Sequence, residues 1–338
     1  MTVEPATKTR NDLALEQTAE RIRSGRRFLI TSHRNPDGDA IGSALALKWM
    51  IESLGKEARV LVRDLYSPPL RHLPGVDEVE IAGTLPPGYP NGVDALFTME
   101  CPENERCGYP ILPGPVINID HHVGNTRYGE INFLDLDAPS VGEMLLHLNG
   151  ILKVPVDRRI ATAIYVSLAS DTGFFRYTNT TLRAFEAATF LVRSGADPGE
   201  ISLWLNETVS AAALRLQARC IATLELSHQG RVATMVMPRS FLAEVGATAE
   251  EAEGLSSLGR TIDGVLISIF LKEADGGTRV SLRAKPGADV QQIASMFGGG
   301  GHKAASGCLI PMGLPEAKAK LLSIISQLFE SSPEGSPR

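Results

Sequence analysis

The sequence predicts an α/β fold, in which an N-terminal domain with a mainly parallel sheet flanked by helices precedes a smaller α+β domain. Two patterns in the first half predict this. Short apolar runs end at polar or Gly- and Pro-rich turns, and segments with apolar residues at helical spacing lie between or after them. The strand candidates are residues 28–32, 58–63, 95–99 and 116–120. Because strands that alternate with helices form parallel sheets, ligands are expected beyond their carboxyl ends.

The helices of the first domain are predicted from the helical spacing of their apolar residues. They cover residues 40–54, 140–150, 158–170 and 182–195. Gly195 closes the last of them, since glycine readily adopts the left-handed conformation in which helices end.

The second domain is predicted from three further strands and two helices. The strands cover residues 231–237, 264–273 and 278–285, and the helices lie around 289–296 and 315–330. A length of 338 residues suits two domains. We therefore predict a first domain at 12–195, a linker at 196–214, a second domain at 215–330 and a disordered tail at 331–338.

Composition excludes several classes of protein. With 43% hydrophobic and 21% charged residues, the chain is neither collagen-like nor wholly disordered. No apolar run reaches the roughly 18–20 residues that span a bilayer, and the N-terminus lacks an apolar signal core, so we expect a cytoplasmic protein that does not bind membranes. Four cysteines without C-x-x-C spacing predict neither a zinc site nor a disulfide framework.

The net charge of −6 argues against binding to long duplex DNA, which needs many clustered Lys and Arg residues. The acidity is uneven. Residues 1–214 hold 20 basic and 27 acidic residues, whereas residues 215–330 hold 12 and 11. The acidic excess therefore belongs to the first domain.

A first cluster of chemically active residues follows the first strand. His33, Asp37 and Asp39 offer one imidazole and two carboxylates within seven residues. Pro36 and Gly38 favour a tight turn that would direct these side chains to one point. The structural alternative is a polar turn in which Asp39 caps the next helix.

Three further candidates lie near the ends of other elements. Asp120, His121 and His122 follow an apolar strand and suit a mixed nitrogen and oxygen metal site. A carboxylate beside a ligating imidazole is the usual device for fixing its tautomer, which favours a metal site over two unrelated histidines. Glu100 ends the strand at 95–99, and Asp171 ends the helix at 158–170, where it could also be a solvated cap.

Taken in order, these motifs resemble the DHH phosphoesterase superfamily. The motifs are HxNPDGDAIGS at 33–43, an acidic residue at 100, DHH at 120–122 and SDTGxF at 170–175. Residues 297–307, FGGGGHKAASG, resemble the DHHA1 substrate-binding domain of the same family. The resemblance runs from about residue 15 to 330. The short two-domain form is most similar to the bacterial nano-RNase and pAp-phosphatase branch, which is RecJ-like but lacks the extra domains of the longer RecJ exonucleases.

The resemblance implies two metal ions, usually Mn²⁺, with Mg²⁺ or Co²⁺ as substitutes. The ligands of one ion would be His33, Asp37 and Glu100, and those of the other Asp39, His121 and Asp171, with Glu100 bridging. Asp120 would orient the site, and His122 would face the substrate phosphate. Two ions would activate a bridging water for attack on phosphorus.

Position 100 departs from the commoner family pattern, in which Asp stands there. The longer Glu100 side chain can still bridge two ions but places its carboxylate differently. Cys101 next to it raises the question of a sulfur ligand, for which the carboxylate is the better candidate. Whether Glu100 bridges as Asp would is not fixed by the sequence.

Substrate contacts are expected in the second domain. Consecutive glycines allow a phosphate to approach backbone N–H groups, although no Walker ending follows them. The residues expected to bind substrate are Arg283, Gly299, Gly300, Gly301, His302 and Lys303. Lys285 could be a second anchor for substrate, but it is equally consistent with a solvated charge at a strand end.

The predicted function is Mn²⁺-dependent hydrolysis of very short RNA or DNA oligonucleotides to mononucleotides, of pAp to AMP, or of both. The enzymatic alternative is a linear or cyclic dinucleotide phosphodiesterase. An inorganic pyrophosphatase is disfavoured by the DHHA1-like segment at 297–307. The non-enzymatic alternative is a nucleotide-sensing module, encouraged only by Glu100. The sequence allows a homodimer but fixes neither the oligomeric state, the physiological metal nor the preferred substrate.

Overall fold

The computed structural model describes residues 9–109, 112, 114–252 and 254–331. The chain divides into two compact units, residues 1–208 and 209–338. Among the described residues, no helix combines the length and the apolar character that crossing a membrane requires.

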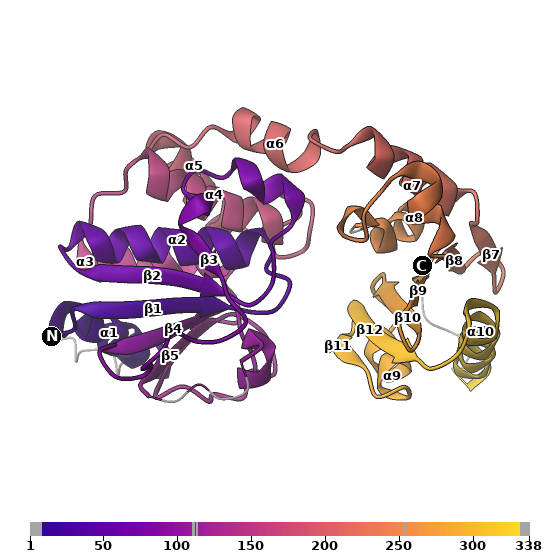
Figure 1. Cartoon of the computed structure of the whole chain (residues 1–338), viewed down its shortest axis with the longest axis horizontal. Coiled ribbons are helices and arrows are strands. Elements are labelled where there is room, and N and C mark those ends of the chain that lie inside the picture. The colour runs from indigo at the N-terminus through magenta and orange to yellow at the C-terminus, as the bar shows by residue number, and fades with distance from the viewer. Residues whose placement is uncertain (1–8, 110–111, 113, 253, 332–338) are drawn as a thin grey trace, which may run out of the picture. The chain divides into compact units, whose positions relative to one another are not determined.

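The N-terminal unit is built on one parallel sheet (Figure 1). Its strands are β1 (Arg27–Ser32), β2 (Glu57–Val62), β3 (Val79–Ile81), β4 (Ala95–Met99), β5 (Val116–Asp120) and β6 (Ile131–Leu134). They lie in the order β3-β2-β1-β4-β5-β6, and every neighbouring pair is parallel. The predicted parallel α/β sheet is therefore confirmed. Because β1, β4 and β5 are adjacent, their carboxyl ends share one edge, which we call the carboxyl edge.

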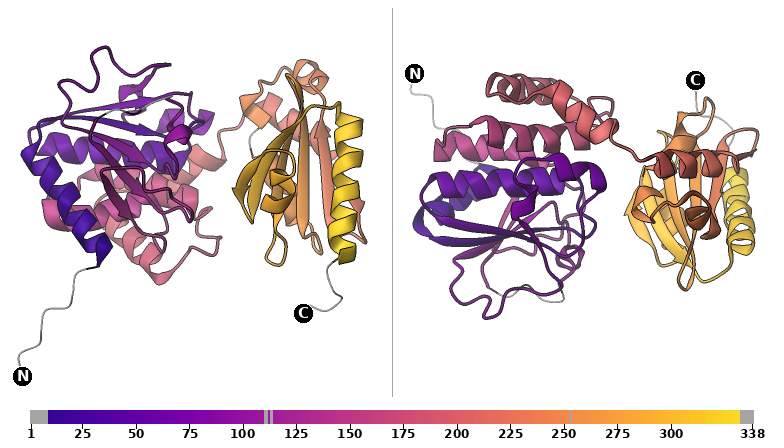
Figure 2. Two further views of the ribbon diagram at one scale, coloured as in Figure 1. Left: turned by 90° about the horizontal axis from the view of Figure 1, so that it is seen from below. Right: turned by 45° about the horizontal axis from the view of Figure 1, so that its top comes forward.

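Helices pack against one face of this sheet, and helices α4 and α5 form a further layer over them (Figures 1 and 2). The helices of the unit are α1 (Arg10–Ser24), α2 (Gly38–Ser53), α3 (Val141–Leu152), α4 (Arg158–Asp171), α5 (Leu182–Arg193) and α6 (Pro198–Asn206). Short 3₁₀ turns are η1 (Pro68–His72), η2 (Val76–Glu78) and η3 (Asn104–Cys107). A smaller apolar group on the opposite face is closed by loops and contains Leu29, Leu61, Leu96, Cys101, Cys107, Tyr109 and Val116.

Helix α2 is the central helix of the unit, since all of its residues from Gly38 to Met50 are buried. Its contact with α4 depends on Gly42. A Cβ atom at Gly42 would lie 2.5 Å from the carbonyl oxygen of Ala163, so a larger residue would push the two helices apart. This close packing sets the position of the α2 N-terminus, which carries two of the predicted ligands.

The predicted strands and helices of this unit are confirmed within two residues at nearly every end. The elements that the sequence did not predict are α1, β3, β6 and α6. Strands β3 and β6 have three and four residues, too few for a periodic pattern. The segment 196–214, for which we predict a linker, contains α6 and the first turn of the next helix.

The C-terminal unit is a six-stranded mixed sheet with helices, as the α+β prediction requires. Its strands are β7 (Glu225–Ser227), β8 (Val232–Met237), β9 (Ile267–Ala274), β10 (Gly277–Ala284), β11 (Gly300–His302) and β12 (Ala305–Ile310). Its helices are α7 (Ala211–Ile221), α8 (Ser240–Val245), α9 (Val290–Ser295) and α10 (Leu314–Ser331), with 3₁₀ turns η4 (Glu250–Ala252) and η5 (Leu255–Thr261). The order is β11-β12-β10-β9-β8-β7, and only β8 and β9 pair in parallel.

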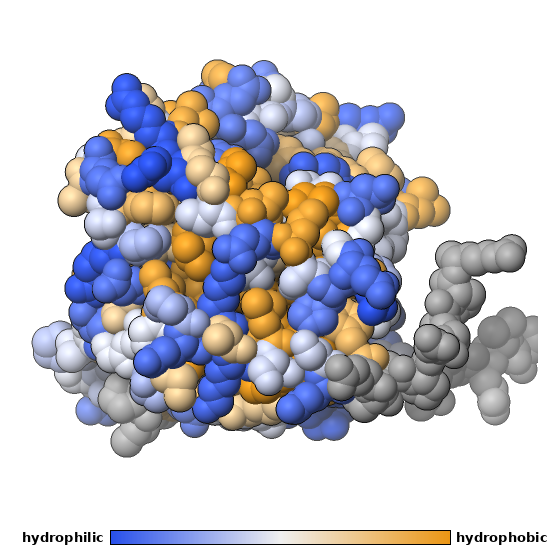
Figure 3. All heavy atoms as spheres, turned by 90° about the vertical axis from the view of Figure 1, so that its right-hand side faces the viewer, coloured by the Kyte–Doolittle hydropathy of each residue, from blue (hydrophilic) through white to orange (hydrophobic). Residues whose placement is uncertain are grey.

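Strands β7, β11 and β12 and helix α8 were not predicted, because they are short or glycine-rich. The predicted disordered tail at 331–338 lies outside the described residues except for Ser331. The face of this unit drawn in Figure 3 carries hydrophobic side chains interspersed with hydrophilic ones. Such a mixed surface is ordinary, because much of the surface of any folded protein is apolar.

Candidate metal centre

The predicted ligands of the N-terminal unit gather at the carboxyl edge. His33 directly follows β1, Glu100 follows β4, and His121 and His122 follow β5, whose last residue is Asp120. These strands are mostly apolar, and the polar residues at their carboxyl ends are themselves buried: Asp120 is fully buried, Glu100 is 4% exposed and His33 is 6% exposed. Parallel pairing therefore brings residues that are distant in the sequence to one place.

The α2 N-terminus contributes the two aspartates of the first motif, in different roles. The helix begins at Gly38, and the Asp37 side chain accepts the backbone N–H of Ala40 at 3.0 Å. Asp37 is therefore the N-cap. The alternative that Asp39 caps this helix is wrong, because Asp39 lies one residue inside it.

Asp39 is fully buried and accepts hydrogen bonds on both carboxylate oxygens. Its Oδ2 accepts the backbone N–H of Val141 at 2.8 Å, and its Oδ1 accepts the Ser167 hydroxyl at 2.6 Å. Val141 begins α3, so the carboxylate lies at the positive end of that helix dipole. A Cβ atom at Gly142 would lie 2.1 Å from the Ser167 Oγ, so only glycine allows this approach.

Asp171 is the last residue of α4. Its Oδ2 accepts the side-chain N–H of Asn179 at 3.2 Å, and the same Asn179 amide donates to the Asp171 carbonyl oxygen. Gly173, Phe174 and Phe175 follow with three successive positive φ angles of 56–61°, and this left-handed turn reverses the chain. Asn179 thus returns to the end of α4 and fixes the orientation of the Asp171 carboxylate.

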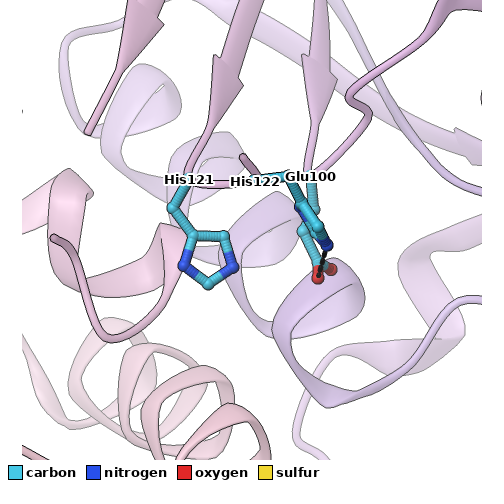
Figure 4. Close-up of side chains that lie close together, drawn as sticks. All are labelled: Glu100, His121 and His122. Carbon is cyan, nitrogen blue, oxygen red and sulfur yellow. Dashed lines mark ion pairs between the residues drawn. The ribbon is translucent and has the colours of Figure 1, made fainter. Parts of the chain in front are cut away.

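Three overlapping groups place their ligand atoms within 4.8 Å of one another: His33, Asp37 and Glu100; Asp39, Glu100, His121 and Asp171; and Glu100, His121 and His122. Glu100 belongs to all three groups, which is the geometry that a bridging carboxylate requires. Figure 4 shows Glu100 and His122 facing each other, with the ring of His121 beside them. The His122 Nε2 lies 4.0 Å from a Glu100 carboxylate oxygen.

All three histidines make a hydrogen bond through Nδ1 and direct Nε2 toward carboxylates. Nδ1 of His33 bonds the carbonyl of Arg34, Nδ1 of His121 bonds that of Ala138, and Nδ1 of His122 bonds Asp120 at 2.8 Å. Since carbonyl and carboxylate oxygens only accept, these bonds assign the proton to Nδ1. When such a ring is neutral, Nε2 is the atom that carries the lone pair and can bind a metal ion or a proton.

The Nε2 atoms approach the carboxylates closely. Nε2 of His33 lies 3.1 Å from Glu100, and Nε2 of His121 lies 3.7 Å from Asp171 and 3.8 Å from Asp39. Although burial opposes protonation, Asp39 and Asp171 raise the pKa of His121 to about 9. Glu100 in the same way raises the pKa of His33.

Burial and mutual repulsion raise the pKa values of two carboxylates of the centre. Burial, together with repulsion from Asp37, raises the pKa of Glu100 well above its usual range. Burial and repulsion from Asp39 raise the pKa of Asp171 to about 7. Mutually repelling buried carboxylates with imidazole nitrogens among them suit divalent cations, which would relieve that repulsion. The oxygen and nitrogen donors fit a hard or borderline ion such as Mn²⁺ or Mg²⁺.

The backbone at Glu100 is unusual and excludes a simple continuation of β4. Glu100 has φ of 59°, and its N–H donates to the Ile119 carbonyl at 3.0 Å. Left-handed non-glycine residues of this kind cluster at functional sites. Cys101 belongs to none of the three groups found among the described residues, and burial raises the pKa of its thiol. Of these two neighbouring residues, only Glu100 lies among the candidate metal donors of the described residues.

Beneath His122 lies a chain of hydrogen bonds that the sequence did not reveal. Asp120 is fully buried, and its second oxygen accepts the Asn125 amide at 2.5 Å. The same amide donates to Asn118 at 2.8 Å, and Asn118 donates in turn to Tyr128 and Thr98. The hydrogen bond with His122, the largest influence that favours ionisation, lowers the pKa of Asp120 although burial opposes it. The one hint of this network in the sequence is Asn118, a polar residue within the otherwise apolar start of β5.

The C-terminal unit brings its predicted residues together in another way. Arg283 of β10 and His302 of β11 both pair with Ala305 of β12, so their backbones lie in one row across the sheet. Gly300 and Gly301 lie in the edge strand β11, and Lys303 follows it. A Cβ atom at Gly299 would lie 2.2 Å from the Gly307 carbonyl, so close strand approach requires this glycine. The side chain of His302 lies outside the described part.

Comparison with known proteins assigns a different family domain to each of the two units. Residues 27–168 match the DHH family, N-terminal domain, and residues 230–331 match the DHHA1 domain. The chain is 32% identical over 303 residues to the bifunctional oligoribonuclease and PAP phosphatase NrnA of Thermus thermophilus, covering 88% of this chain and 89% of that protein.

Two further proteins show how widely the fold is used. The cyclic-di-AMP phosphodiesterase PdeA of Listeria monocytogenes is 26% identical over 356 residues, which cover 97% of this chain and 51% of PdeA. The crystal structure of an exopolyphosphatase-related protein from Bacteroides fragilis superposes with a TM-score of 0.86 at 22% identity, covering 94% of this chain and 98% of that one. This structural likeness establishes the fold.

Proposed function

Because this chain belongs to the DHH family of phosphoesterases, we propose that it hydrolyses very short oligonucleotides to mononucleotides, and 3'-phosphoadenosine-5'-phosphate to AMP. One observation carries the proposal. Carboxylates and imidazoles from three strand ends and two helix ends form three overlapping groups, each with its ligand atoms within 4.8 Å of one another, and Glu100 is common to all three. The Thermus relative, named for both activities, supports this choice of substrates.

We assign two divalent ions, Mn²⁺ by preference, to this centre. His33, Asp37 and Glu100 would hold one, and Asp39, His121 and Asp171 would hold the other, with Glu100 shared. The fit rests on Nδ1 hydrogen bonds that leave Nε2 of His33 and His121 directed at carboxylates, and on carboxylates that repel one another. When bound, such ions stabilise negative charge on a phosphoryl group and lower the pKa of water.

His122 and Asp120 have a separate role in the proposal. Asp120 holds the Nδ1 proton of His122, so Nε2 is the atom presented to the phosphate. Because Asp120 is buried and ionised, it stabilises positive charge on the ring when Nε2 is protonated. A protonated Nε2 would donate to a phosphate oxygen and offset the charge that grows there.

The C-terminal unit would bind the remainder of the nucleotide. Arg283 offers a planar guanidinium for phosphate or base, and the edge strand at Gly300 and Gly301 lets a phosphate approach the backbone. Each stacked base contributes about 1–3 kcal/mol, so a small anchor of this kind suits a substrate of a few nucleotides.

The test is a substrate panel with purified protein and Mn²⁺. A labelled RNA dinucleotide, pAp and a longer duplex are supplied at equal concentration. We expect AMP from pAp, mononucleotides from the dinucleotide, no cleavage of the duplex, and loss of all turnover with a chelator. The variant Asp137→Asn changes an exposed aspartate that lies outside the three ligand groups, and it should give the same products as the unchanged protein. Intact dinucleotide and intact pAp after incubation with metal-loaded protein would overturn the proposal.

A second candidate function is hydrolysis of a linear or cyclic dinucleotide such as cyclic di-AMP. The likeness to PdeA over 97% of this chain favours it. Adding cyclic di-AMP and its linear product to the panel separates the two functions by their kcat/KM. A single-turnover measurement also separates hydrolysis from nucleotide sensing, because a sensor would release the nucleotide unchanged.

A further inference from the structure

Two cysteines lie against each other directly behind the metal centre. The Sγ atoms of Cys101 and Cys107 are 3.0 Å apart, and both side chains are fully buried. Cys101 immediately follows Glu100, the carboxylate shared by all three ligand groups. The loop between the cysteines contains Pro102 and the 3₁₀ turn η3, and it ends at Gly108 with φ of 77°.

The backbone of this loop contacts two of the other segments that carry candidate ligands. The Arg106 carbonyl accepts the N–H of Arg34, next to His33, at 2.7 Å. The Pro102 carbonyl accepts the N–H of Thr126, in the segment after His122, at 2.9 Å. A covalent change within the loop therefore acts on a segment that joins three ligand-bearing parts of the chain.

We propose that Cys101 and Cys107 form a reversible dithiol–disulfide pair, which hydrogen peroxide oxidises and which alters the metal centre through Glu100. The proposal concerns the chain's own sulfur atoms, and its effect on metal binding rests on the proposed function. A separation of 3.0 Å needs only a small further approach to reach the S–S bond length of about 2.0 Å. Neighbouring thiols in this arrangement are a modification site that a single buried cysteine would not provide.

The chemistry balances with peroxide as the oxidant. One thiolate attacks a peroxide oxygen, the O–O bond breaks, and a sulfenic acid forms with release of one water after proton transfer. The second thiol attacks that sulfur, its proton goes to the departing hydroxide, and the S–S bond forms with release of a second water. The two sulfurs are oxidised together by two electrons, and peroxide is reduced to two waters. Because both sulfurs are buried, the reaction proceeds through transient opening of the loop.

The consequence for the metal centre follows from the position of Cys101. Bond formation draws the Cys101 backbone toward Cys107 and so moves Glu100, which has little freedom at its positive φ. Displacing the support of a metal ligand typically weakens metal binding or activity by about 10–100-fold. We therefore expect Mn²⁺ to bind about tenfold more weakly, or worse, in the oxidised protein. Reduction should restore the original affinity.

The chain contains its own control thiols. Cys220 packs in the apolar group around α7 and β8, and Cys308 packs in the group around β10 and β12. Both are buried, as are Cys101 and Cys107. Burial alone therefore does not distinguish the pairs, whereas the short sulfur–sulfur distance does.

The experiment treats the full-length protein with hydrogen peroxide, unfolds it and alkylates the remaining thiols before peptide mass mapping. We expect a cross-linked peptide that joins Cys101 to Cys107 and is lighter by two hydrogen atoms, with Cys220 and Cys308 both alkylated. A thiol reductant should reverse the change. Calorimetric titration with Mn²⁺, on the reduced and oxidised protein, measures the loss of affinity without any hydrolysis assay.

Two variants make the result specific. Cys107→Ala should bind Mn²⁺ normally and should keep its affinity after peroxide, whereas Cys220→Ala should behave as the unchanged chain does. Four alkylated cysteines after peroxide treatment would overturn the proposal. So would a Cys101–Cys107 disulfide that leaves Mn²⁺ affinity unchanged. The peptide map of the unchanged chain decides the first point even if a variant folds poorly, and it is independent of whether the protein hydrolyses nucleotides.

Discussion

The two units present their chemically active residues in opposite ways. In the N-terminal unit, Asp39 and Glu100 are buried, and Asp39 is held by backbone N–H groups of another helix. In the C-terminal unit, Gly300 and Gly301 lie in the edge strand β11, and Arg283 is the last residue but one of β10. One unit encloses most of its candidate ligands, with Asp37 exposed, and the other presents an edge strand.

The difference reflects what each task demands. A metal centre requires several donors within a few tenths of an ångström of their positions, so each donor needs its own supporting hydrogen bond. Binding a short nucleotide tolerates looser geometry, because stacking and phosphate contacts are less directional. Changes in the N-terminal unit should therefore affect turnover, and changes in the C-terminal unit should affect substrate affinity.

The largest effect is expected from His121→Ala. Nε2 of His121 lies between Asp39 and Asp171, so its loss removes a donor and leaves two carboxylates repelling each other. We expect kcat to fall by more than about 100-fold, the upper end of what the loss of a ligand's supporting group costs. Steady-state kinetics with pAp measures it, and metal content is measured alongside. His72→Ala, at an exposed histidine of η1, is the control and should retain full activity. Equal kcat in both variants would contradict the ligand assignment.

Removal of the metal should change the thermal unfolding of the two units differently, as measured by scanning calorimetry. Mn²⁺ at about 100 times its Kd stabilises the native state by about 2.7 kcal/mol. For a unit of about 200 residues this raises Tm by roughly 5–10 °C. Only the transition of the N-terminal unit should shift, because the ligand groups lie in it. His121→Ala should abolish most of the shift, and an equal shift of both transitions would contradict the separation of roles.

The fold could be predicted further from the sequence than the site could. Strands β1, β4 and β5 are short, mostly apolar runs that are almost entirely buried, and such runs stand out in a sequence. Short elements such as β3 and β6 have no such pattern. Their places are set by pairing with β2 and β5, which only the three-dimensional sheet supplies.

The candidate ligands could be proposed from the sequence because each lies next to a strand end or at a helix terminus. The supporting residues could not. Ser167 reaches Asp39 across 128 positions, and it lies inside an apolar helix whose periodicity gives it no distinction. The role of Asp37 as N-cap depended on where α2 begins, and a start two residues earlier than predicted moved the cap from Asp39 to Asp37. Hydrogen bonds of this kind form where elements that are distant in the sequence pack together, and local sequence patterns carry no information about that packing.

Asn125 tests whether the supporting hydrogen bonds matter as the comparison requires. Asn125→Ala removes the amide that donates to Asp120 and Asn118, so Asp120 no longer holds His122 in one orientation. We expect kcat to fall by about 10–100-fold with little change in KM or in Mn²⁺ affinity. Asn149→Ala is the control, because its side chain bonds only the backbone of Val154. A loss of Mn²⁺ binding in Asn125→Ala, or the same kcat as in the control, would show that Asn125 does not act through His122.

Arg283→Ala should have the smallest effect and the opposite kinetic signature. Arg283 lies in the C-terminal unit, in the strand row that includes Ala305 and His302, and belongs to none of the ligand groups. Its loss should raise KM for pAp by about tenfold, the lower end of a 1–3 kcal/mol contact, and leave kcat nearly unchanged. Arg279→Ala, at an exposed position on the same strand, controls for loss of charge. If Arg283→Ala lowered kcat instead, the C-terminal unit would contribute to turnover itself, and the division between rigid ligand support and looser substrate binding would fail.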